Sequence, residues 1–121
     1  DAYSEEKDES GETRIVLKLN PQLSPIKLAV FPLLRNNDKL LVLAKDIYNQ
    51  VREKFLCDYD ESGSIGRRYR RQDEIGTPWC LTVDHLSLEN DTLTIRHRDS
   101  MEQERIHRDE VLKWVEEKLM S

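Results

Sequence analysis

The segment that most constrains the fold of this chain is IKLAVFPLL, residues 26–34. Its apolar side chains occupy odd and even positions alike, which is the pattern of a strand covered on both faces of a sheet. The next segment, residues 38–55, is predicted to be a helix, because Asn37 or Asp38 can cap it and apolar side chains recur at helical spacing. These side chains are Leu40, Leu43, Ala44, Ile47, Tyr48, Val51 and Phe55. A covered strand followed by an amphipathic helix predicts a sheet with helices packed against it.

The rest of the chain predicts further elements in an order that defines the sheet. Strands are expected at residues 13–19, 55–60, 79–84, 92–99 and 102–107, and helices at residues 65–75 and 109–119. Strands separated by helices predict parallel neighbours, whereas the short links between the last three strands predict antiparallel hairpins. The expected fold is therefore α/β with a mixed sheet. Residues 1–12 are instead typical of a solvated, turn-like segment.

The formal net charge of −5 is concentrated at the N-terminus. Residues 1–12 contain six acidic residues and one lysine, so they account for the whole net charge and leave residues 13–121 neutral. Within the neutral part, one short segment carries four arginines: Arg67, Arg68, Arg70 and Arg71. The acidic total is therefore only weak evidence against an anionic partner.

Hydropathy and cysteine content indicate the environment of the protein. A mean hydropathy of −0.74 and the absence of any apolar run of about 18 residues exclude a transmembrane helix, and no secretory signal is visible. Cys57 and Cys80 are expected to be buried free thiols in a reducing cytosol, with a disulfide as the alternative. No Cys/His spacing typical of a metal site occurs. We therefore expect a cytoplasmic chain without a metal or a membrane partner.

The arginine cluster lies in the helix predicted at residues 65–75. Projected at about 100° per residue, the side chains form three groups. These are a core face (Ile65, Tyr69, Gln72 and Gly76), a solvent face (Arg67, Arg70 and Glu74) and a shoulder (Arg68, Arg71 and Ile75). The stem of Arg68 is expected to pack at this boundary.

Two interpretations of these arginines are open from the residues alone. They can form ion pairs on a solvated helix, or they can contact phosphates and base edges, because a guanidinium offers a planar fork of donors. Arg96 and Arg98 share one face of the strand predicted at residues 92–99. If both sets faced the same edge of the sheet, six arginines would converge, which a solvated helix does not require.

Catalytic motifs are missing from the sequence. His85, His97 and His107 are dispersed and have no nucleophile or carboxylate at motif spacing. Neither a P-loop nor a Ser-His-Asp set occurs. The residues therefore predict a small α/β binding module rather than a self-sufficient enzyme.

Three stretches of the chain are distinctive: PIKLAVFPL, YDESGSIGRRYRRQDEIGTPWCLTVD and LTIRHRDSMEQERI. Together they resemble the C-terminal anticodon-binding domain of the glycyl-tRNA synthetases, which belong to the class II aminoacyl-tRNA synthetases. The resemblance implies a five-stranded mixed β-sheet with three α-helices, formed by residues 25–121 as an anticodon-binding domain. Residues 1–24, an acidic segment followed by a strand and a linker, are similar to the end of the preceding catalytic domain.

The resemblance also implies a longer parent, a glycine–tRNA ligase that activates glycine with ATP and transfers it to tRNA. ATP and Mg²⁺ would bind the parent's catalytic domain, so this chain is expected to hold no cofactor and to be inactive alone. Its expected partner is glycine tRNA, bound through the anticodon loop. It is not expected to bind DNA or a membrane. The parent is expected to be a homodimer.

Glycine tRNAs have cytosines at the second and third anticodon positions. The resemblance implies that the arginines recognise these cytosines. An unstacked cytosine presents O2 and N3 as acceptors and its N4 amino group as a donor. The expected donors to cytosine are Arg67, Arg68, Arg71, Arg96 and Arg98, and the expected acceptors are Asp60, Glu74 and Asp84. The alternative is a protein-interaction or dimer-stabilising module of the same fold, such as the accessory subunit of a DNA polymerase.

Overall fold

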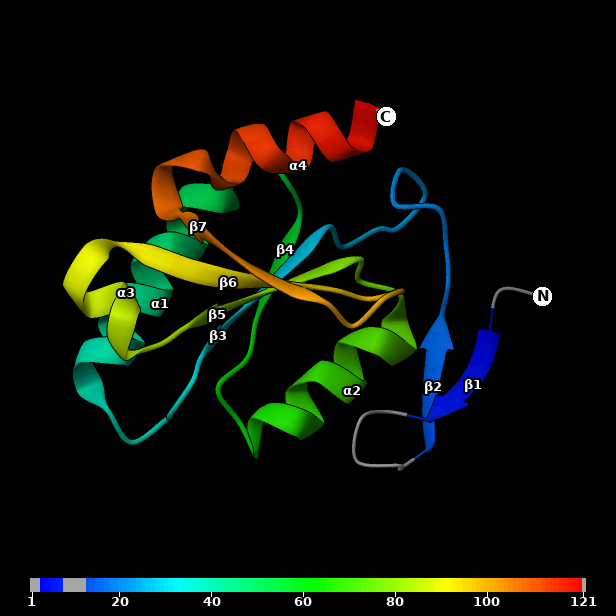
Figure 1. Cartoon of the computed structure of the whole chain (residues 1–121), viewed down its shortest axis with the longest axis horizontal. Coiled ribbons are helices and arrows are strands. Elements are labelled where there is room, and N and C mark those ends of the chain that lie inside the picture. Colours follow the sequence, from blue (N-terminus) through cyan, green and yellow to red (C-terminus); the bar gives the residue numbers. More distant parts are fainter. Residues whose placement is uncertain (1–2, 8–12, 121) are drawn as a thin grey trace.

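The computed structural model describes residues 3–7 and 13–120 and contains a five-stranded sheet with helices on both faces (Figure 1). The strands of this sheet are β3 (Leu28–Pro32), β4 (Cys57–Tyr59), β5 (Trp79–Val83), β6 (Thr92–His97) and β7 (Gln103–His107). The helices are α1 (Asp38–Val51), α2 (Ile65–Ile75), α3 (His85–Asn90) and α4 (Val111–Met120), the last preceded by a 3₁₀ turn, η1 (Arg108–Glu110). Two further strands, β1 (Tyr3–Lys7) and β2 (Thr13–Leu17), form a separate antiparallel pair.

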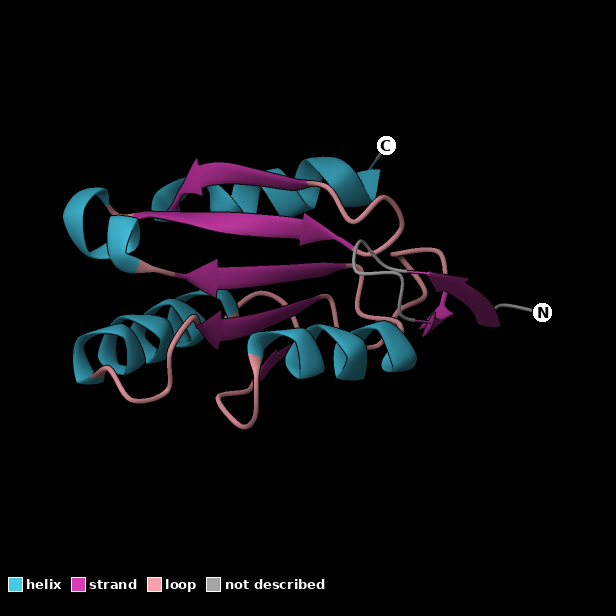
Figure 2. Cartoon of the chain, turned by 60° about the horizontal axis from the view of Figure 1, so that its bottom comes forward, coloured by secondary structure: helices cyan, strands magenta, loops and turns pink. Residues whose placement is uncertain are grey.

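The five-stranded sheet is mixed and has the order β4-β3-β5-β6-β7, with strands running in both directions in Figure 2. β3 is parallel to both β4 and β5, whereas β5 with β6 and β6 with β7 form antiparallel pairs. The register places Leu28 of β3 between Cys57 and Trp79 of its two neighbours. The predicted mixed sheet is confirmed, because each pair of parallel neighbours is joined through a helix.

The central strand β3 is buried over its whole length, as its two-sided apolar pattern predicts. Leu28 and Val30 belong to a large core that α1 and α4 cover. Ala29 and Phe31 lie on the opposite face, where α2 covers a much smaller apolar cluster that includes Cys80. Figure 1 shows α4 and α2 on opposite sides of the sheet. Because α2 rests on few apolar side chains, polar contacts contribute more to its attachment.

Local sequence sets the ends of α1 and α2. The side chain of Asn37 accepts a hydrogen bond from the Leu40 N–H over 3.2 Å and caps α1, and Ser64 caps α2 in the same way. α2 ends at Gly76, whose φ of 84° lies in the left-handed region that glycine adopts without strain. The bounds predicted for α2 are confirmed.

Two details of the predicted fold are wrong. Within the turn-like segment expected at residues 1–12, Tyr3–Lys7 forms β1 and pairs with β2, while the rest of that segment lies outside the described residues. The link between β5 and β6 is not a short hairpin, because α3 occupies it. Asp84 and Ser87 start α3 by a capping box, in which each side chain accepts a hydrogen bond from the other residue's N–H. The α/β class is confirmed, and α3 is added to the three helices expected.

The β1–β2 pair lies beside α2 (Figure 1). Val16 of β2 is fully buried. Gly76 approaches β2 so closely that a Cβ at this position would lie 3.1 Å from the Leu17 carbonyl oxygen. The strand that precedes the five-stranded sheet is therefore packed against the end of the arginine-rich helix.

Candidate nucleic-acid interface

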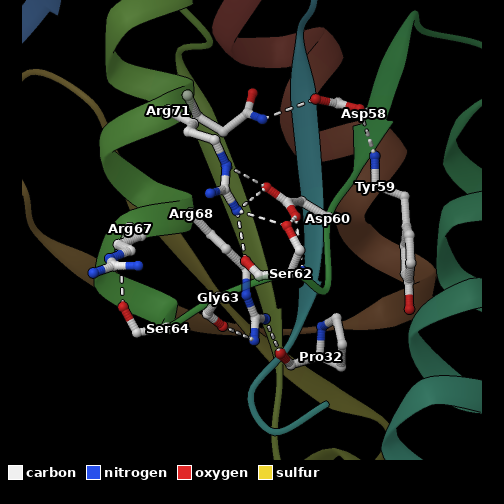
Figure 3. A network of polar contacts seen from close by, with 11 residues as sticks. Pro32, Asp58, Tyr59, Asp60, Ser62, Gly63, Ser64, Arg67, Arg68 and Arg71 are labelled. Carbon is white, nitrogen blue, oxygen red and sulfur yellow. Dashed lines mark hydrogen bonds and ion pairs between the residues drawn. The ribbon is translucent and has the colours of Figure 1, made fainter.

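The arginine-rich helix α2 begins at the end of the sheet where the parallel strands β3 and β4 terminate. Residues 60–64 lead from β4 into α2, and Ser64 is the N-cap. In open α/β sheets, ligands bind outside the carboxyl ends of parallel strands, and the N-terminal end of a helix favours anions. The candidate site therefore comprises residues 60–64 and the first turns of α2 (Figure 3).

Arg71 and Asp60 form an ion pair at this site (Figure 3). Arg71 Nε and Nη2 donate hydrogen bonds to Asp60 Oδ2 over 2.8 and 2.6 Å, and Nη2 also donates to the Ser62 carbonyl oxygen over 2.6 Å. Burial by itself raises the pKa of Asp60, but the hydrogen bonds from Ser62 and Arg71 outweigh it and hold the pKa below its usual value. Because 43% of the Arg71 side chain is exposed, its guanidinium can also contact a ligand.

Arg68 is buried between α2 and the end of β3, with 2% of its surface exposed. Its Nη1 donates to the Pro32 carbonyl oxygen and its Nη2 to the Gly63 carbonyl oxygen, the latter over 3.2 Å (Figure 3). Burial lowers the pKa of the guanidinium, while Asp60 acts in the opposite direction. Among the described residues, no carboxylate lies within ion-pair distance of Arg68. The expected packing of its stem is confirmed.

The exposed face of α2 differs in part from the helical projection. Arg67 and Glu74 are exposed, as expected. Arg70, expected on the solvent face, is half-buried, whereas Ile75 is exposed. The buried side chains of α2 are Arg68, Gln72 and Asp73. The buried stripe is polar because polar groups of the sheet lie opposite it.

Arg96 extends from β6 to the underside of α2. Its Nη1 and Nη2 donate to the two carboxylate oxygens of Asp73 over 3.1 and 3.4 Å. Its guanidinium also lies 4.6 Å from the centre of the Tyr69 ring, a cation–π contact. Arg96 and Asp73 are 8% and 1% exposed. This buried pair therefore holds α2 on the sheet.

Arg98 lies at the opposite end of α2 and is 3% exposed. It donates to the Gly76 carbonyl oxygen over 3.0 Å, to the Leu19 carbonyl oxygen over 2.6 Å and to Asp99 Oδ1 over 2.8 Å. The condition under which six arginines would converge is therefore not met, because internal partners bind the guanidiniums of Arg96 and Arg98. Contact of either residue with RNA stays a prediction.

Asp84 and Arg105 form a second ion pair, at the carboxyl end of β5. Arg105 donates to both carboxylate oxygens of Asp84, and its Nη1 donates to Thr92 Oγ1 over 2.9 Å. Burial raises the pKa of Asp84, but the hydrogen bonds from Arg105 and the Ser87 N–H outweigh it and lower the pKa. Arg105 was not among the site residues predicted from the sequence, although alternation in β7 places it on the face of the sheet that Arg96 occupies.

The predicted site residues thus separate into three groups. Asp60, Arg67, Arg68 and Arg71 surround the start of α2, and Glu74 follows on its exposed side. Asp84 belongs to the neighbouring pair with Arg105. Arg96 and Arg98 lie under α2 and at its end, as internal contacts.

The described part of the chain was also searched for a metal site, reactive thiols and membrane-spanning helices. It contains no group of three or more His, Cys, Asp or Glu side chains that could hold a metal ion. Cys57 and Cys80 are buried and free, as predicted, and burial raises the pKa of both thiols, that of Cys57 to about 12. No described helix has the length and apolar character needed to span a membrane.

Comparison with known proteins assigns the family. Residues 27–118 match the family described as Anticodon binding domain. The chain belongs to this anticodon-binding family. The arginine-rich helix α2 and the five-stranded sheet all lie within the matched residues.

The relatives of this anticodon-binding domain include glycine–tRNA ligases. The chain is 55% identical to the ligase of Clostridium acetobutylicum over 98% of its own length and 25% of the relative's. The ligase of Caldanaerobacter subterraneus subsp. tengcongensis is 58% identical over the same shares, and that of Borrelia hermsii is 47% identical over 100% of the chain and 27% of the relative. The chain therefore spans about a quarter of the length of the curated relatives it matches.

A solved structure shares the fold of this anticodon-binding domain. The RNA binding domain of threonyl-tRNA synthetase from Cryptosporidium parvum Iowa II matches with a TM-score of 0.74 and 22% sequence identity. The match covers 84% of this chain and 25% of that chain. At this low identity the likeness shows the fold alone.

Proposed function

We propose that this chain is the anticodon-recognition domain of a glycine–tRNA ligase and that it binds the anticodon loop of glycine tRNA. Membership of the anticodon-binding family and 47–58% identity to glycine–tRNA ligases support the proposal. Residues 25–121 form the binding domain in this proposal, and residues 1–24 belong to the end of the preceding catalytic domain.

The observation that carries the proposal is the presence of two exposed arginines, Arg67 and Arg71, on α2 of a domain of this family. Arg67 is exposed, and the guanidinium of Arg71 is oriented by Asp60 while a large part of its side chain stays accessible. Exposed guanidiniums beside a helix N-terminus favour a phosphate backbone. The carboxylates of Asp60, Glu74 and Asp84 can accept hydrogen bonds from the N4 amino group of cytosine.

Arg96 and Arg98 act as positioning residues in this proposal, besides the base contacts predicted for them. Arg96 binds Asp73 under α2, and Arg98 binds the Gly76 carbonyl at its C-terminal end. Both keep the helix, and with it the exposed arginines, in a fixed place on the sheet. Their replacement should therefore change binding of any RNA together with the stability of the domain.

The parent ligase supplies the chemistry in this proposal. It activates glycine with ATP and Mg²⁺ in a catalytic domain outside these residues and transfers the glycine to tRNA, whereas this domain selects the tRNA. The length of the relatives leaves room for such a domain. We also propose that the parent is a cytoplasmic homodimer and that its nucleic-acid partner is tRNA and not DNA.

The test measures binding of a labelled glycine anticodon stem-loop by fluorescence anisotropy over a range of salt concentrations. Binding should weaken with salt, as expected for phosphate contacts. A stem-loop in which the two anticodon cytosines are replaced should bind about tenfold or more weakly, because each lost base contact is worth about 1–3 kcal/mol. A DNA duplex of equal length is the control for non-specific binding.

Equal binding of both stem-loops would contradict anticodon recognition. Absence of RNA binding, together with salt-insensitive self-association in sedimentation, would instead favour the protein-interaction module. In a separate assay, the isolated chain should show no glycine-dependent exchange of pyrophosphate into ATP, and exchange above a protein-free blank would contradict the assignment of catalysis to a separate domain.

A further inference from the structure

A groove of about 520 Å³ lies between α1 and α3, two helices that pack against each other at one end of the molecule (Figure 1). Val42 and Leu43 of α1 and Leu88 of α3 form its apolar lining. Val42 is 70% exposed and Leu88 is 40% exposed. Single exposed apolar side chains are common on monomers, whereas contiguous ones that line a groove are typical of an interaction surface.

The charged side chains at this groove carry both signs. Asp38, Lys39 and Asp46 of α1 line it and are exposed. Arg108 Nη2 donates to Asp46 Oδ2 over 2.8 Å, so this carboxylate is held in place while 65% of its side chain stays accessible. A surface with both signs of charge matches a partner of mixed charge better than a strongly basic or strongly acidic one.

The order of these side chains along α1 makes the groove complementary to itself. Lys39, Val42 and Asp46 form one stripe, because positions three, four and seven apart lie on the same side of a helix. An antiparallel copy of α1, related by a two-fold axis that passes between positions 42 and 43, brings Lys39 opposite the partner's Asp46 and Val42 opposite the partner's Leu43. The symmetry makes each contact twice. Asp38 lies about 80–100° around the helix from Lys39 and Asp46 and stays in solvent.

We propose that this groove binds a second copy of the chain, with α1 packed antiparallel against α1 of the partner. Apolar contacts of Val42, Leu43 and Leu88 supply most of the binding energy, since exposed ion pairs contribute little. The two pairs of Lys39 with the partner's Asp46 set the register. One helix face and the edge of α3 form less surface than the about 1,200–2,000 Å² that a stable interface buries, so we expect a weak dimer with a dissociation constant of about 0.1 mM.

The proposed dimer is compatible with RNA binding. Helix α1 covers one face of the five-stranded sheet and α2 covers the other, so a second copy on α1 leaves the exposed arginines of α2 accessible (Figure 1). The inference therefore does not depend on the proposed function. Failure of the chain to bind any stem-loop would contradict the proposed function alone.

The first test compares the chain with Val42→Ser and Leu56→Ser by sedimentation equilibrium between about 20 μM and about 1 mM, a range that spans the expected dissociation constant. Serine and valine have similar helix propensities, so Val42→Ser removes the apolar contact and keeps α1 intact. Leu56 is 65% exposed but precedes β4 outside the groove, and its variant is the matched control. Val42→Ser should weaken self-association about tenfold or more, and Leu56→Ser should leave it unchanged.

The second test exchanges the charges that set the register. Lys39→Asp and Asp46→Lys should each weaken self-association about tenfold, because like charges then face each other across the two-fold axis. An equimolar mixture of the two variants should associate as strongly as the unmodified chain, since both contacts of the mixed dimer join opposite charges. Thermal denaturation of each variant, at an exposed position, checks that the fold is kept.

Two results would overturn the dimer: a chain that stays monomeric up to about 1 mM, or self-association that Val42→Ser does not weaken. Self-association unaffected by Val42→Ser would place the contact on another surface. A mixture of Lys39→Asp and Asp46→Lys that associates no better than its components would overturn the antiparallel packing of α1.

Discussion

Arg98 donates a hydrogen bond to the carbonyl oxygen of Leu19 over 2.6 Å, although 79 positions separate the two residues in the sequence. The same guanidinium donates to the Gly76 carbonyl oxygen at the end of α2, and the Ser24 hydroxyl also donates to that oxygen over 3.0 Å. Arg98 therefore ties the segment between β2 and β3 to the C-terminus of the arginine-rich helix.

Arg98→Ala should lower the free energy of unfolding by about 3 kcal/mol or more, because buried charged hydrogen bonds are lost and the Gly76 and Leu19 carbonyls keep fewer donors. Urea denaturation measures this change. Arg67→Ala is the matched control, since Arg67 is exposed on α2, and it should change stability by less than about 0.5 kcal/mol. Equal stability of the two variants would show that Arg98 does not hold these segments together.

Arg96 and Asp73 should be strongly coupled in a double-mutant cycle. Each single replacement, Arg96→Met or Asp73→Leu, removes the buried ion pair between these two residues and should destabilise the domain by about 3–5 kcal/mol. The double variant should be more stable than the sum of the single losses predicts, because neither charge is left behind. The free energies of unfolding are measured by denaturation in guanidinium chloride. If the losses of the two single variants simply added up in the double variant, the ion pair would contribute no interaction energy.

Arg67→Ala should weaken binding to every stem-loop by the same factor and reduce the slope of log affinity against log salt by about one, as a phosphate contact does. Arg52→Ala provides the comparison, because Arg52 is an exposed arginine at the C-terminus of α1, away from α2. It should leave both affinity and slope unchanged. A selective loss for the cytosine-containing stem-loop in Arg67→Ala would assign base recognition to this residue instead.

The order of strands and helices could be predicted from the sequence because it depends on apolar periodicity. β3 has a two-sided apolar run, and α2 has a serine cap at one end and a glycine stop at the other. β1 could not be found in this way, because its pairing with β2 is made through the backbone and its sequence, YSEEK, lacks an apolar alternation. α3 is only six residues long, although its Asp-x-x-Ser cap was an available signal.

The candidate site was less predictable because its arginines bind partners that are distant in the sequence. The helical projection treats apolar side chains as the buried ones and therefore places Ile75 beside the core. In the structure Arg68 and Asp73 are buried instead, because the Pro32 carbonyl and Arg96 lie opposite them. The number of arginines was visible in the sequence, but which of them face solvent was decided by the fold.

The Arg71–Asp60 pair should make stability depend on acid pH. The pKa of Asp60 is below the usual value of 3.8 in the folded state, so the unfolded chain binds more protons and stability falls as pH falls through this range. The contribution of the pair to stability is fully present above the pKa that Asp60 has in the unfolded chain. It is lost below the pKa that Asp60 has in the folded state. Because Arg71 is partly exposed, we expect it to be less than about 1 kcal/mol.

Asp60→Asn and Arg71→Met should both reduce the loss of stability measured by denaturation between about pH 6 and about pH 2.5. Asp60→Asn should reduce this loss more than Arg71→Met does, because Asp60 keeps its hydrogen bonds from Ser62 when Arg71 is replaced. If Asp60→Asn lost as much stability at acid pH as the unmodified chain does, the Asp60 carboxylate would make no contribution to the pH dependence.

Replacing either of the two glycines at the ends of α2 by alanine should change the stability of the domain, but in opposite directions. Gly76 has a φ of 84°, and an added Cβ would lie 3.1 Å from the Leu17 carbonyl oxygen, so Gly76→Ala combines backbone strain with a close contact to β2. It should destabilise the domain by more than about 1 kcal/mol. Gly66 lies in the first turn of α2, where an added Cβ meets no atom within 4 Å. Gly66→Ala should therefore stabilise the domain by about 0.4–1 kcal/mol, because alanine loses less backbone entropy on folding. Thermal denaturation of the two variants side by side measures both effects.

The two outcomes test different features of α2. A loss of stability in Gly66→Ala would show that the start of α2 needs the conformational freedom of glycine. Unchanged stability in Gly76→Ala would contradict the close packing of α2 on β2.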